Sequence, residues 1–367
     1  MPAQTIAQTW LARIRELALP RPIRLMNVCG GHERSISFSG IRGALPPGIE
    51  IIPGPGCPVC VCPEEDLYEA IRLSLEEDVV LVAFGDMLRV PANVPKGEPR
   101  SLEQARAAGA DVRPVASPQE AASIARAEPD KPVVFFVAGF ETTTAPVAAM
   151  LAEGVPDNLL ILLAARLTWP AVAMLLDSGE AAFDALIAPG HVATVMGPEE
   201  WSFVVERHRM PAAIAGFTPE SLLAATYSVL RQTIEDRPFL DNCYPELVRP
   251  GGNPTARRWL SEVMQVEDAN WRGIGIIPDS GFALRPAWQH LDARRVFPAP
   301  EDTRRRAGEM PPGCDCASVV LGRIFPDQCR LYGRACTPRN PIGPCMVSDE
   351  GACRIWWSSG LREARSA

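Results

Sequence analysis

Cysteine is the residue of this 367-residue sequence whose placement points most directly to chemistry, because most of the eleven cysteines are grouped. Cys29 opens the segment Cys-Gly-Gly-His-Glu, while Cys57 and Cys60 form a Cys-x-x-Cys pair that Cys62 follows. Thiols of a cytosolic protein are kept reduced, so such groups indicate metal binding or redox chemistry rather than a disulfide framework. Six more lie near the C-terminal end, Cys314, Cys316, Cys329, Cys336, Cys345 and Cys353, and Cys243 stands alone.

The Cys29 segment directly follows a predicted strand. Its paired glycines permit unusual backbone angles and the close approach of a ligand to the main chain. The Cys29 thiol, the His32 imidazole and the Glu33 carboxylate together offer a soft metal ligand, or a nucleophile with acid–base support. The same residues also fit a tight strand-to-helix turn with a buried cysteine and a surface histidine. The spacing leaves both interpretations open.

The Cys57–Cys60 pair precedes an acidic stretch, residues 64–66, that opens a predicted helix. A Cys-x-x-Cys at a helix N-terminus is a common redox arrangement, because amide groups and the helix dipole stabilise a thiolate. The pair could instead be half of a zinc site, but no second Cys-x-x-Cys or histidine pair completes one. Redox chemistry is therefore favoured, and the neighbouring acidic residues leave the thiol pKa open.

The six C-terminal cysteines are interleaved with glycine and proline. Four thiolates hold a [4Fe–4S] cluster, and such loops let the backbone wrap it and donate amides to its sulfurs. The two remaining thiols could form a disulfide beside the cluster. A two-zinc site is the alternative, made less attractive by the lack of histidine in this run. Spacing alone does not assign the four ligands.

The elements between these groups must position them. From residue 20 to about 235, short β-type runs alternate with helix-type stretches, which is typical of parallel sheets covered on both faces. We therefore expect an α/β protein with two doubly wound parallel-sheet domains around a cleft, residues 1–115 and 116–235, and a smaller irregular iron–sulfur domain over 236–367. The predicted strands are Ile23–Val28, Val79–Phe84, Val133–Ala138, Leu159–Leu163, Ala185–Ala188 and Gly273–Ile277. The predicted helices are Glu64–Glu77, Leu102–Ala108, Pro118–Ala127, Pro146–Glu153, Trp169–Ser178 and Pro219–Glu235.

Two further loops follow predicted strands and carry polar side chains. Glu141 follows the strand over 133–138, and His191 follows the strand over 185–188. Ligands of open α/β sheets gather outside the carboxyl ends of the strands, so these loops and the Cys29 segment are expected at such an edge. A carboxylate at a strand tip is hard to explain by capping alone, whereas a lone histidine is more often structural.

Composition excludes several classes of function. The chain has 44 acidic and 36 basic residues, a net charge of −8, and no basic tract, so nucleic-acid binding is not expected. The longest apolar run, Leu159–Ala165, is too short to cross a bilayer. The opening residues lack the pattern of a secretory signal, so we expect a cytoplasmic protein that does not associate with a membrane.

Together these motifs resemble the HypD family of hydrogenase maturation factors over nearly the full chain. The resemblance rests on the Cys29 and Cys57 segments, Gly139-Phe140-Glu141-Thr142-Thr143, Pro189-Gly190-His191 and the C-terminal cysteine pattern. It implies a scaffold that assembles the Fe(CN)₂CO group of [NiFe] hydrogenases with a HypC-type small chaperone. It also implies that HypE, working with HypF, delivers cyanide.

The resemblance also implies roles for individual residues. Cys29 resembles the thiolate ligand of the iron under construction, which transiently carries cyanide and carbonyl, with His32 close to it. Cys57 and Cys60 resemble a redox-active pair, and Cys316 with Cys345 a second dithiol pair. An electron route from cluster to dithiol to dithiol to iron would follow. The implied [4Fe–4S] ligands are Cys314, Cys329, Cys336 and Cys353, and Glu141, Thr142 and His191 match motifs that face the central cleft.

One residue departs from the family pattern. Cys62 stands where the family usually has threonine, a natural helix cap, so it could exchange with the Cys57–Cys60 pair or simply replace the cap. A competing function is an iron–sulfur-dependent thiol–disulfide reductase, which would leave the Cys29 segment and the Glu141 loop unexplained. A nucleotide-binding protein is disfavoured because no Walker or Rossmann glycine pattern follows the strands. Whether the protein is an enzyme or a redox-capable scaffold is not decided by the residues.

Overall fold

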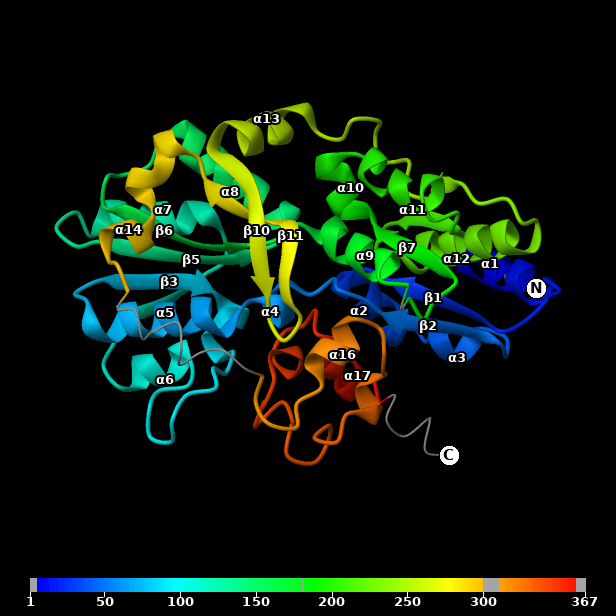
Figure 1. Cartoon of the computed structure of the whole chain (residues 1–367), viewed down its shortest axis with the longest axis horizontal. Helices are drawn as coiled ribbons and strands as arrows, with labels where there is room; N and C mark the ends of the chain where they lie inside the picture. The colour runs from blue at the N-terminus through cyan, green and yellow to red at the C-terminus, as the bar shows by residue number, and fades with distance from the viewer. Residues whose placement is uncertain (1–4, 180, 300–309, 361–367) are drawn as a thin grey trace.

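Two parallel sheets form the core of the computed structural model, which describes residues 5–179, 181–299 and 310–360. The first sheet has the order β2-β1-β7-β8-β9 and the second the order β4-β3-β5-β6. All strand pairs in both sheets are parallel. This confirms the α/β class with two parallel-sheet units, and Figure 1 shows them side by side with a smaller C-terminal region below. The strands of the first sheet are β1 (Ile23–Asn27), β2 (Ile49–Pro53), β7 (Ala185–Pro189), β8 (Ala212–Ala215) and β9 (Leu240–Asn242), and those of the second are β3 (Val80–Phe84), β4 (Val112–Val115), β5 (Val133–Gly139) and β6 (Leu159–Ala165).

Sheet membership does not follow the expected divisions at residues 115 and 235. Strands β3 and β4 lie before residue 116, yet they belong to the second sheet, where β3 pairs with both β4 and β5. Strand β7 returns to the first sheet beside β1, and β8 pairs with β7. Strand β9 lies beyond residue 235 and adds to the same first sheet. Alternating strands and helices predict parallel sheets, but the pattern does not say which sheet a strand joins, because any crossover helix can bury the same apolar face.

The strands of the second sheet are apolar because both faces are covered. Every residue of β5 and of β6 is buried. A central parallel strand has no solvent face, so its sequence reads as a continuous apolar run instead of an alternating one. This explains why the sequence identified these strands while the less uniform β4, which contains Arg113 and Pro114, was missed.

The predicted helices are present, and local caps define where several of them begin. Ser117 accepts a hydrogen bond from the Glu120 amide ahead of α7, and Pro118 occupies the first helical turn. Thr218 and Pro219 begin α12 in the same way. The α-helices are α1 (Ile6–Arg15), α2 (Gly30–Phe38), α3 (Ile41–Ala44), α4 (Pro58–Val61), α5 (Glu64–Glu76), α6 (Leu102–Ala107), α7 (Pro118–Ala127), α8 (Glu141–Glu153), α9 (Thr168–Asp177), α10 (Gly190–Met196), α11 (Ser202–Glu206), α12 (Pro219–Ile234), α13 (Pro254–Val263), α14 (Ala293–Val296), α16 (Cys316–Val320) and α17 (Ala352–Ser358).

A long antiparallel hairpin joins the α/β region to the C-terminal region. It consists of β10 (Met264–Trp271) and β11 (Gly275–Leu284) and packs against β6 and α9. The strand predicted over 273–277 begins only at Gly275, because Gly273 adopts the left-handed conformation of the turn, with φ +70°. Figure 1 shows the turn of the hairpin reaching toward α4 and the C-terminal region.

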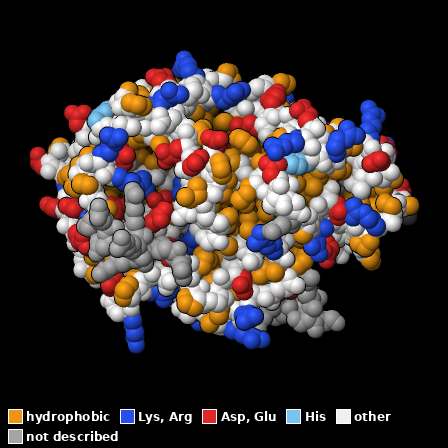
Figure 2. All heavy atoms as spheres, in the orientation of Figure 1, with side chains coloured by type: hydrophobic (Ala, Val, Ile, Leu, Met, Phe, Trp, Pro, Cys, Tyr) orange, Lys and Arg blue, Asp and Glu red, His pale blue; other side chains and the backbone are white. Residues whose placement is uncertain are grey.

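The C-terminal region has little regular structure and contacts both N-terminal cysteine segments. Helix α17 packs on α2, while α16 and the 3₁₀ turn η5 (Pro344–Met346) pack on α4. Figure 2 shows acidic and basic side chains interspersed over one face of the molecule and hydrophobic side chains near its centre. Among the described helices, none has the length and hydropathy that a membrane crossing requires.

Candidate metal and thiol site

Cys29 lies in the turn between β1 and α2. It is the half-buried N-cap residue of α2, and Asn27 Nδ2 steadies the turn by donating to the Cys29 carbonyl at 3.0 Å. Burial raises the pKa of the Cys29 thiol to about 12, and the Glu350 carboxylate adds to this effect. The backbone amides of His32 and Gly31 donate to the thiol and oppose the rise in its pKa. The Cys29 thiol is therefore protonated in this structure, and the two amides that donate to it would also stabilise its thiolate form.

Two glycines let the Cys29 turn touch other segments backbone to backbone. The Gly30 amide donates to the Gly56 carbonyl at 3.0 Å. A Cβ atom on Gly56 would lie 2.4 Å from both Cα and N of Cys29. A Cβ atom on Gly30 would lie 2.4 Å from Cβ of Glu350 and 2.5 Å from its carbonyl oxygen. Only glycine permits these approaches, which bring the Cys-x-x-Cys loop and the C-terminal region against Cys29.

His32 is a buried support for the turn, so the surface histidine of the turn interpretation is wrong. The ring is fully buried, with Nε2 2.8 Å from the Ala215 carbonyl oxygen and Nδ1 3.0 Å from Asn27 Oδ1. Burial lowers the pKa of His32 to about 3, so the ring is neutral. Both ring nitrogens have protein partners, and the contact with Cys29 is made by the His32 backbone amide. His32 therefore orients the Cys29 turn.

Glu33 links the same turn to the C-terminal region. Its side chain is 2% exposed and accepts hydrogen bonds from Arg42 Nη2 at 2.6 Å and from Trp356 Nε1 at 2.8 Å. Trp356 lies in α17, more than three hundred residues further along the chain. A buried carboxylate needs such partners, because an uncompensated charge in the interior is costly. The acid–base role considered for Glu33 is therefore replaced by a structural one.

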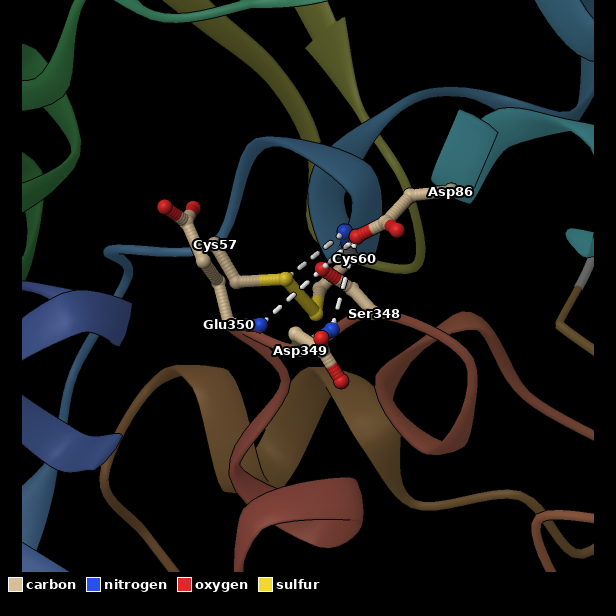
Figure 3. The surroundings of a disulfide bond; sticks show 6 residues. All are labelled: Cys57, Cys60, Asp86, Ser348, Asp349 and Glu350. Carbon is tan, nitrogen blue, oxygen red and sulfur yellow. Dashed lines mark hydrogen bonds between the residues drawn. A yellow bond between two sulfur atoms is a disulfide. The ribbon is translucent and has the colours of Figure 1, made fainter. Parts of the chain in front are cut away.

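The structure joins Cys57 and Cys60 in a disulfide (Figure 3). The pair forms the separate one-turn helix α4, where Cys57 Sγ accepts from the Cys60 amide at 3.2 Å. The expected position at a helix N-terminus is confirmed, since Cys57 is the N-cap residue of α4. This helix is separate from α5, which begins at Glu64 after Pro63. The two cysteines are only 4% and 1% exposed. Figure 3 shows Ser348, Asp349 and Glu350 of the C-terminal region beside this disulfide.

One cysteine from each of the three groups lines the same small cavity. Cys29, Cys57 and Cys345 surround a space of about 10 Å³, together with Gly56 and Glu350. This is about the room that one water molecule requires. Among the described residues, the lining includes none of the candidates His32, Glu141, Thr142 and His191. The structure thus brings the three cysteine groups together. His32 contacts Cys29 only through its backbone amide, and Glu141, Thr142 and His191 lie outside the cavity lining.

The thiols of the C-terminal cysteines contact one another. Cys314 Sγ lies 3.3 Å from Cys316 Sγ. Cys316, Cys345 and Cys353 are hydrogen-bonded together, and the two bonds received by Cys345 lower its pKa well below the usual value. Hydrogen bonding to Cys316 and Cys345 raises the pKa of Cys353. Cys345, which also faces the cavity, is therefore more acidic than Cys353.

The groups that surround the other C-terminal thiols are of the kinds that a cysteine-ligated iron–sulfur cluster requires. The Ile342 amide donates to Cys336 Sγ at 3.4 Å, and burial raises the pKa of both Cys329 and Cys336. A Cβ atom on Gly343 would lie 2.5 Å from Sγ of both Cys314 and Cys316, so glycine leaves room at the sulfurs. An iron–sulfur cluster needs thiolate ligands, backbone amides that donate to its sulfurs, and space that is not filled by side chains. Within the described residues, no group of three or more potential ligands has metal-binding spacing.

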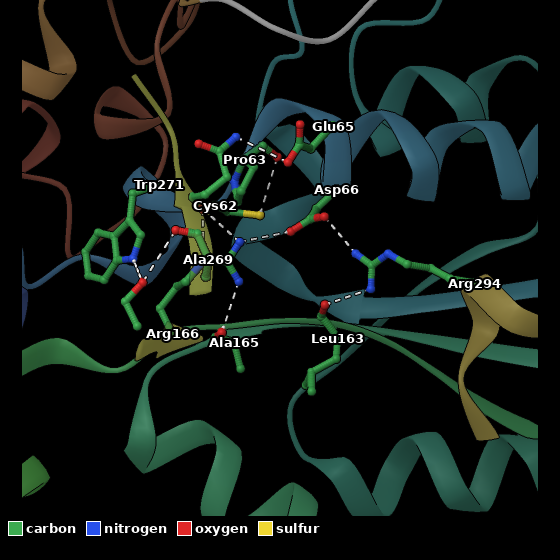
Figure 4. A network of polar contacts seen from close by, with 12 residues as sticks. Cys62, Pro63, Glu65, Asp66, Leu163, Ala165, Arg166, Ala269, Trp271 and Arg294 are labelled. Atoms are coloured by element: carbon green, nitrogen blue, oxygen red, sulfur yellow. Dashed lines mark hydrogen bonds and ion pairs between the residues drawn. The ribbon is translucent and has the colours of Figure 1, made fainter. Parts of the chain in front are cut away.

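Cys62 is a free thiol in a network of charged residues (Figure 4). It is 1% exposed, and its thiol donates to the Pro63 carbonyl at 3.8 Å. Burial raises the pKa of Cys62 to about 12, and the Asp66 carboxylate contributes. Asp66 itself is paired with Arg166 at 3.3 Å and Arg294 at 2.7 Å. Cys62 does not cap α5, whose N-cap residue is Pro63, so the expected cap replacement is wrong.

We expect Cys62 to resist alkylation in the folded protein. With a pKa of about 12, about one thiol in 10⁴ would be ionised at pH 8, and the reactive species is the thiolate. Its reactivity should rise only as the pH approaches 12. The measurement is mass spectrometry after iodoacetamide treatment, with the Cys62→Thr variant as control for peptide assignment. Rapid labelling of Cys62 at pH 8, or its recovery in a disulfide with Cys57 or Cys60, would contradict this prediction.

Glu141 is a buried link between helices α8 and α9, which follow strands β5 and β6 of the second sheet. Its carboxylate accepts from the Thr168 amide and from Thr168 Oγ1, both at 2.7 Å, at the start of α9. Burial raises the pKa of Glu141, while these two hydrogen bonds lower it. Glu141 is therefore neither solvent-facing nor unpaired, and it supplies the cap that α9 lacks in its own sequence. The neighbouring Thr142 is exposed.

His191 belongs to an aromatic cluster at the end of the first sheet. Its ring lies 3.9 Å from that of Phe217 and 5.7 Å from that of Tyr244, between centroids. Phe217 also meets the His32 ring edge-on at 5.6 Å. Burial lowers the pKa of His191, so the ring is neutral near pH 7. His191 thus lies behind the Cys29 turn, connected to it through Phe217 and His32.

Sequence reasoning missed Glu350 and Arg272 near the thiols. Glu350 lines the cavity. Desolvation by the surrounding protein, together with the negative charge of Asp86, raises the pKa of Glu350 to about 7. Its position between Cys345 and Cys353 is the one signal that could have singled it out. Arg272 is buried in the turn of the β10–β11 hairpin, and nothing in the surrounding sequence marks it.

Comparison with known proteins identifies similar chains over nearly the whole length. The family model described as "HypD: Hydrogenase formation hypA family" matches residues 5–360. The chain is 38% identical to hydrogenase maturation factor HypD of Rhodobacter capsulatus over 365 residues, 97% of this chain and 96% of that protein. It is 39% identical to HypD of Azotobacter vinelandii over 364 residues (96% and 94%) and 37% identical to HypD of Escherichia coli over 355 residues (94% and 91%).

Proposed function

The chain belongs to the HypD family of hydrogenase maturation factors, and we propose that it is the scaffold on which the Fe(CN)₂CO group of [NiFe] hydrogenase is assembled. Family membership supports a role in hydrogenase maturation. The observation that supports this more specific role is the meeting of Cys29, Cys57 and Cys345 at one cavity. An assembly site needs a metal ligand and a source of electrons at the same place, and these three residues could provide both.

Cys29 would bind the iron under assembly through its thiolate. Iron that carries cyanide and carbonyl is a soft centre, for which a thiolate is a good ligand. The amides of His32 and Gly31 already donate to this sulfur, and they would stabilise its negative charge once the proton has left. A single thiolate at a strand end also suits iron that must be released to a hydrogenase subunit, because a closed four-ligand cage would retain it.

The C-terminal thiols would hold a [4Fe–4S] cluster, with Cys314, Cys329, Cys336 and Cys353 as ligands. Such a cluster supplies electrons one at a time. Cys316 and Cys345 remain as a dithiol pair, and their thiols already share a hydrogen bond. The Cys57–Cys60 disulfide would take up two electrons and two protons to become two thiols beside Cys29.

The partners follow from the same proposal. A HypC-type small chaperone would share the iron with Cys29, and HypE would deliver cyanide that HypF helps to generate. Phe217 lies against Gly31 of the Cys29 turn, and because it is 42% exposed it offers an apolar side chain for docking. The working compartment would be the cytoplasm.

An iron–sulfur-dependent thiol–disulfide reductase is the competing function. It would use the same C-terminal thiols and the same disulfide. A general reductase must admit a substrate disulfide to its own thiols, whereas Cys57 and Cys60 are 4% and 1% exposed. Their burial favours an internal electron acceptor over an external one.

The test is anaerobic isolation of the protein with the small chaperone, followed by iron, zinc and sulfide analysis and a generic disulfide-reduction assay. We expect iron beyond the content of one cluster, no stoichiometric zinc, and little turnover of the generic disulfide. Rapid turnover that is unaffected by Cys29→Ala would support the reductase and contradict the scaffold.

A further inference from the structure

Arg272 lies between the Cys-x-x-Cys loop and the C-terminal thiols. It occupies the turn of the β10–β11 hairpin, and its amide donates to the Val61 carbonyl at 3.0 Å, one residue after Cys60. The next residue, Gly273, is so close to the C-terminal region that a Cβ atom there would lie 3.1 Å from Cβ of Ala317 in α16. The turn therefore packs between α4 and α16, the helix that begins with Cys316.

The Arg272 guanidinium is buried and only partly satisfied. Its side chain is 1% exposed, forms an ion pair with Glu64, and donates from Nη2 to the Pro91 carbonyl at 2.7 Å. Nε and Nη1 are also buried, and neither has a hydrogen-bond partner among the described residues. Leaving buried donors of a charged group unpaired is costly, so a purely structural role explains this residue poorly.

Arg272 places a positive charge between the two cysteine groups. Its amide contacts Val61 directly after Cys60, and the next residue lies against Ala317 directly after Cys316. The charge of Arg272 lowers the pKa of Cys62, as do Arg166 and Arg294. Those two arginines are both paired with Asp66, whereas Arg272 is paired with Glu64. Arg272 is a buried cation whose neighbour in the chain, Gly273, lies against the helix that begins with Cys316.

We propose that Arg272 raises the reduction potential of the iron–sulfur cluster held by the C-terminal cysteines, an inference that rests on the proposed function. Reduction adds one electron and no proton, so the cluster with its four thiolates becomes more negative by one charge. A buried cation stabilises the more negative state more than the less negative one, and the net charge around a cluster is one of the factors that set its potential. The ion pair with Glu64 attenuates this effect and thereby offers a way to test its sign.

The experiment compares the cluster midpoint potential of the anaerobically isolated protein and four variants by titration with dithionite, followed by visible absorption and electron paramagnetic resonance. For Arg272→Met we expect the reduced-to-oxidised ratio at a fixed potential to fall about tenfold, which is about 59 mV for one electron. For Arg272→Lys, which keeps the charge, we expect a potential close to that of the original protein. For Glu64→Gln, which breaks the same ion pair but removes a negative charge, we expect a shift to higher potential. Arg166→Met is the matched control, since it removes a buried arginine bonded to the same hairpin through the Asn270 carbonyl, and its potential should not change.

The opposite shifts of Arg272→Met and Glu64→Gln separate electrostatics from damage to the fold, because broken packing would move both potentials in the same direction. Shifts of the same sign, an unchanged potential in Arg272→Met, or a full shift in Arg272→Lys would overturn the inference. If Arg272→Met does not fold, the Lys and Gln variants decide between these outcomes. A protein isolated anaerobically without cluster iron and sulfide would instead overturn the proposed cofactor, and the inference would fall with it.

Discussion

Replacing Cys336 by alanine is expected to remove the iron–sulfur cluster, with loss of nearly all of its iron, its sulfide and its visible absorption. In the proposed function Cys336 is a ligand of this cluster, and its sulfur already accepts the Ile342 amide at 3.4 Å. The surrounding region has few long elements to preserve a vacant site, since α16 has five residues and α17 has seven. Cys345→Ala is expected to keep the cluster, because the same proposal gives Cys345 a role in a dithiol pair.

Comparing the cluster content of Cys336→Ala and Cys345→Ala distinguishes a cysteine that binds the cluster from one that belongs to the dithiol pair. Cys243→Ala provides a matched control, since Cys243 is a half-buried thiol that directly follows β9 of the first sheet, and burial also raises its pKa. Iron and sulfide are measured on anaerobically purified samples, and circular dichroism checks that the sheets remain folded. Full cluster content in Cys336→Ala, or its loss in Cys345→Ala, would show that the family ligand set does not apply to this chain.

Gly56→Ala is expected to separate the Cys-x-x-Cys loop from Cys29. The added Cβ atom would lie 2.4 Å from two backbone atoms of Cys29 and 2.7 Å from the carbonyl carbon of Val28. Backbone cannot move aside as a side chain can, so we expect a loss of about 3 kcal/mol or more in the free energy of unfolding. Chemical denaturation measures this loss, and iron analysis of the complex with the small chaperone measures the effect on the site.

Gly85→Ala is the matched control for this change. A Cβ atom there meets nothing within 4 Å, and Gly85 does not need the left-handed conformation. We expect its stability to be close to that of the original protein. If Gly56→Ala matched Gly85→Ala in both stability and iron content, the close packing of the two cysteine segments would not be required for the site.

The fold was predictable from sequence where burial makes a segment uniform. Strands β5 and β6 are buried on both faces, so they read as apolar runs and their bounds differ little from the predicted ones. The hairpin β10–β11 was largely missed because β10 carries Glu267 and Asp268 on an exposed stretch. Which sheet each strand joins depends on long-range packing, which local patterns do not encode.

The sequence was enough to predict which residues form the candidate site, but it was much less informative about which of them contact one another. Spacing alone identified the three cysteine groups, because thiols in such patterns have few structural uses. Spacing could not show that His32 and Glu33 would face inward, since their partners Ala215 and Trp356 are far away in the sequence. Arg272 was missed for the same reason, because a single arginine in a turn carries no local signal.

The most direct test of the central claim, that the Cys29 thiolate holds the iron under assembly, is infrared spectroscopy of the protein isolated anaerobically with its small chaperone. The account predicts bands of iron-bound cyanide and carbonyl in the original protein and in Cys243→Ala. It predicts their absence in Cys29→Ala, in a sample whose cluster iron and sulfide are unchanged. Undiminished bands in Cys29→Ala would contradict the claim.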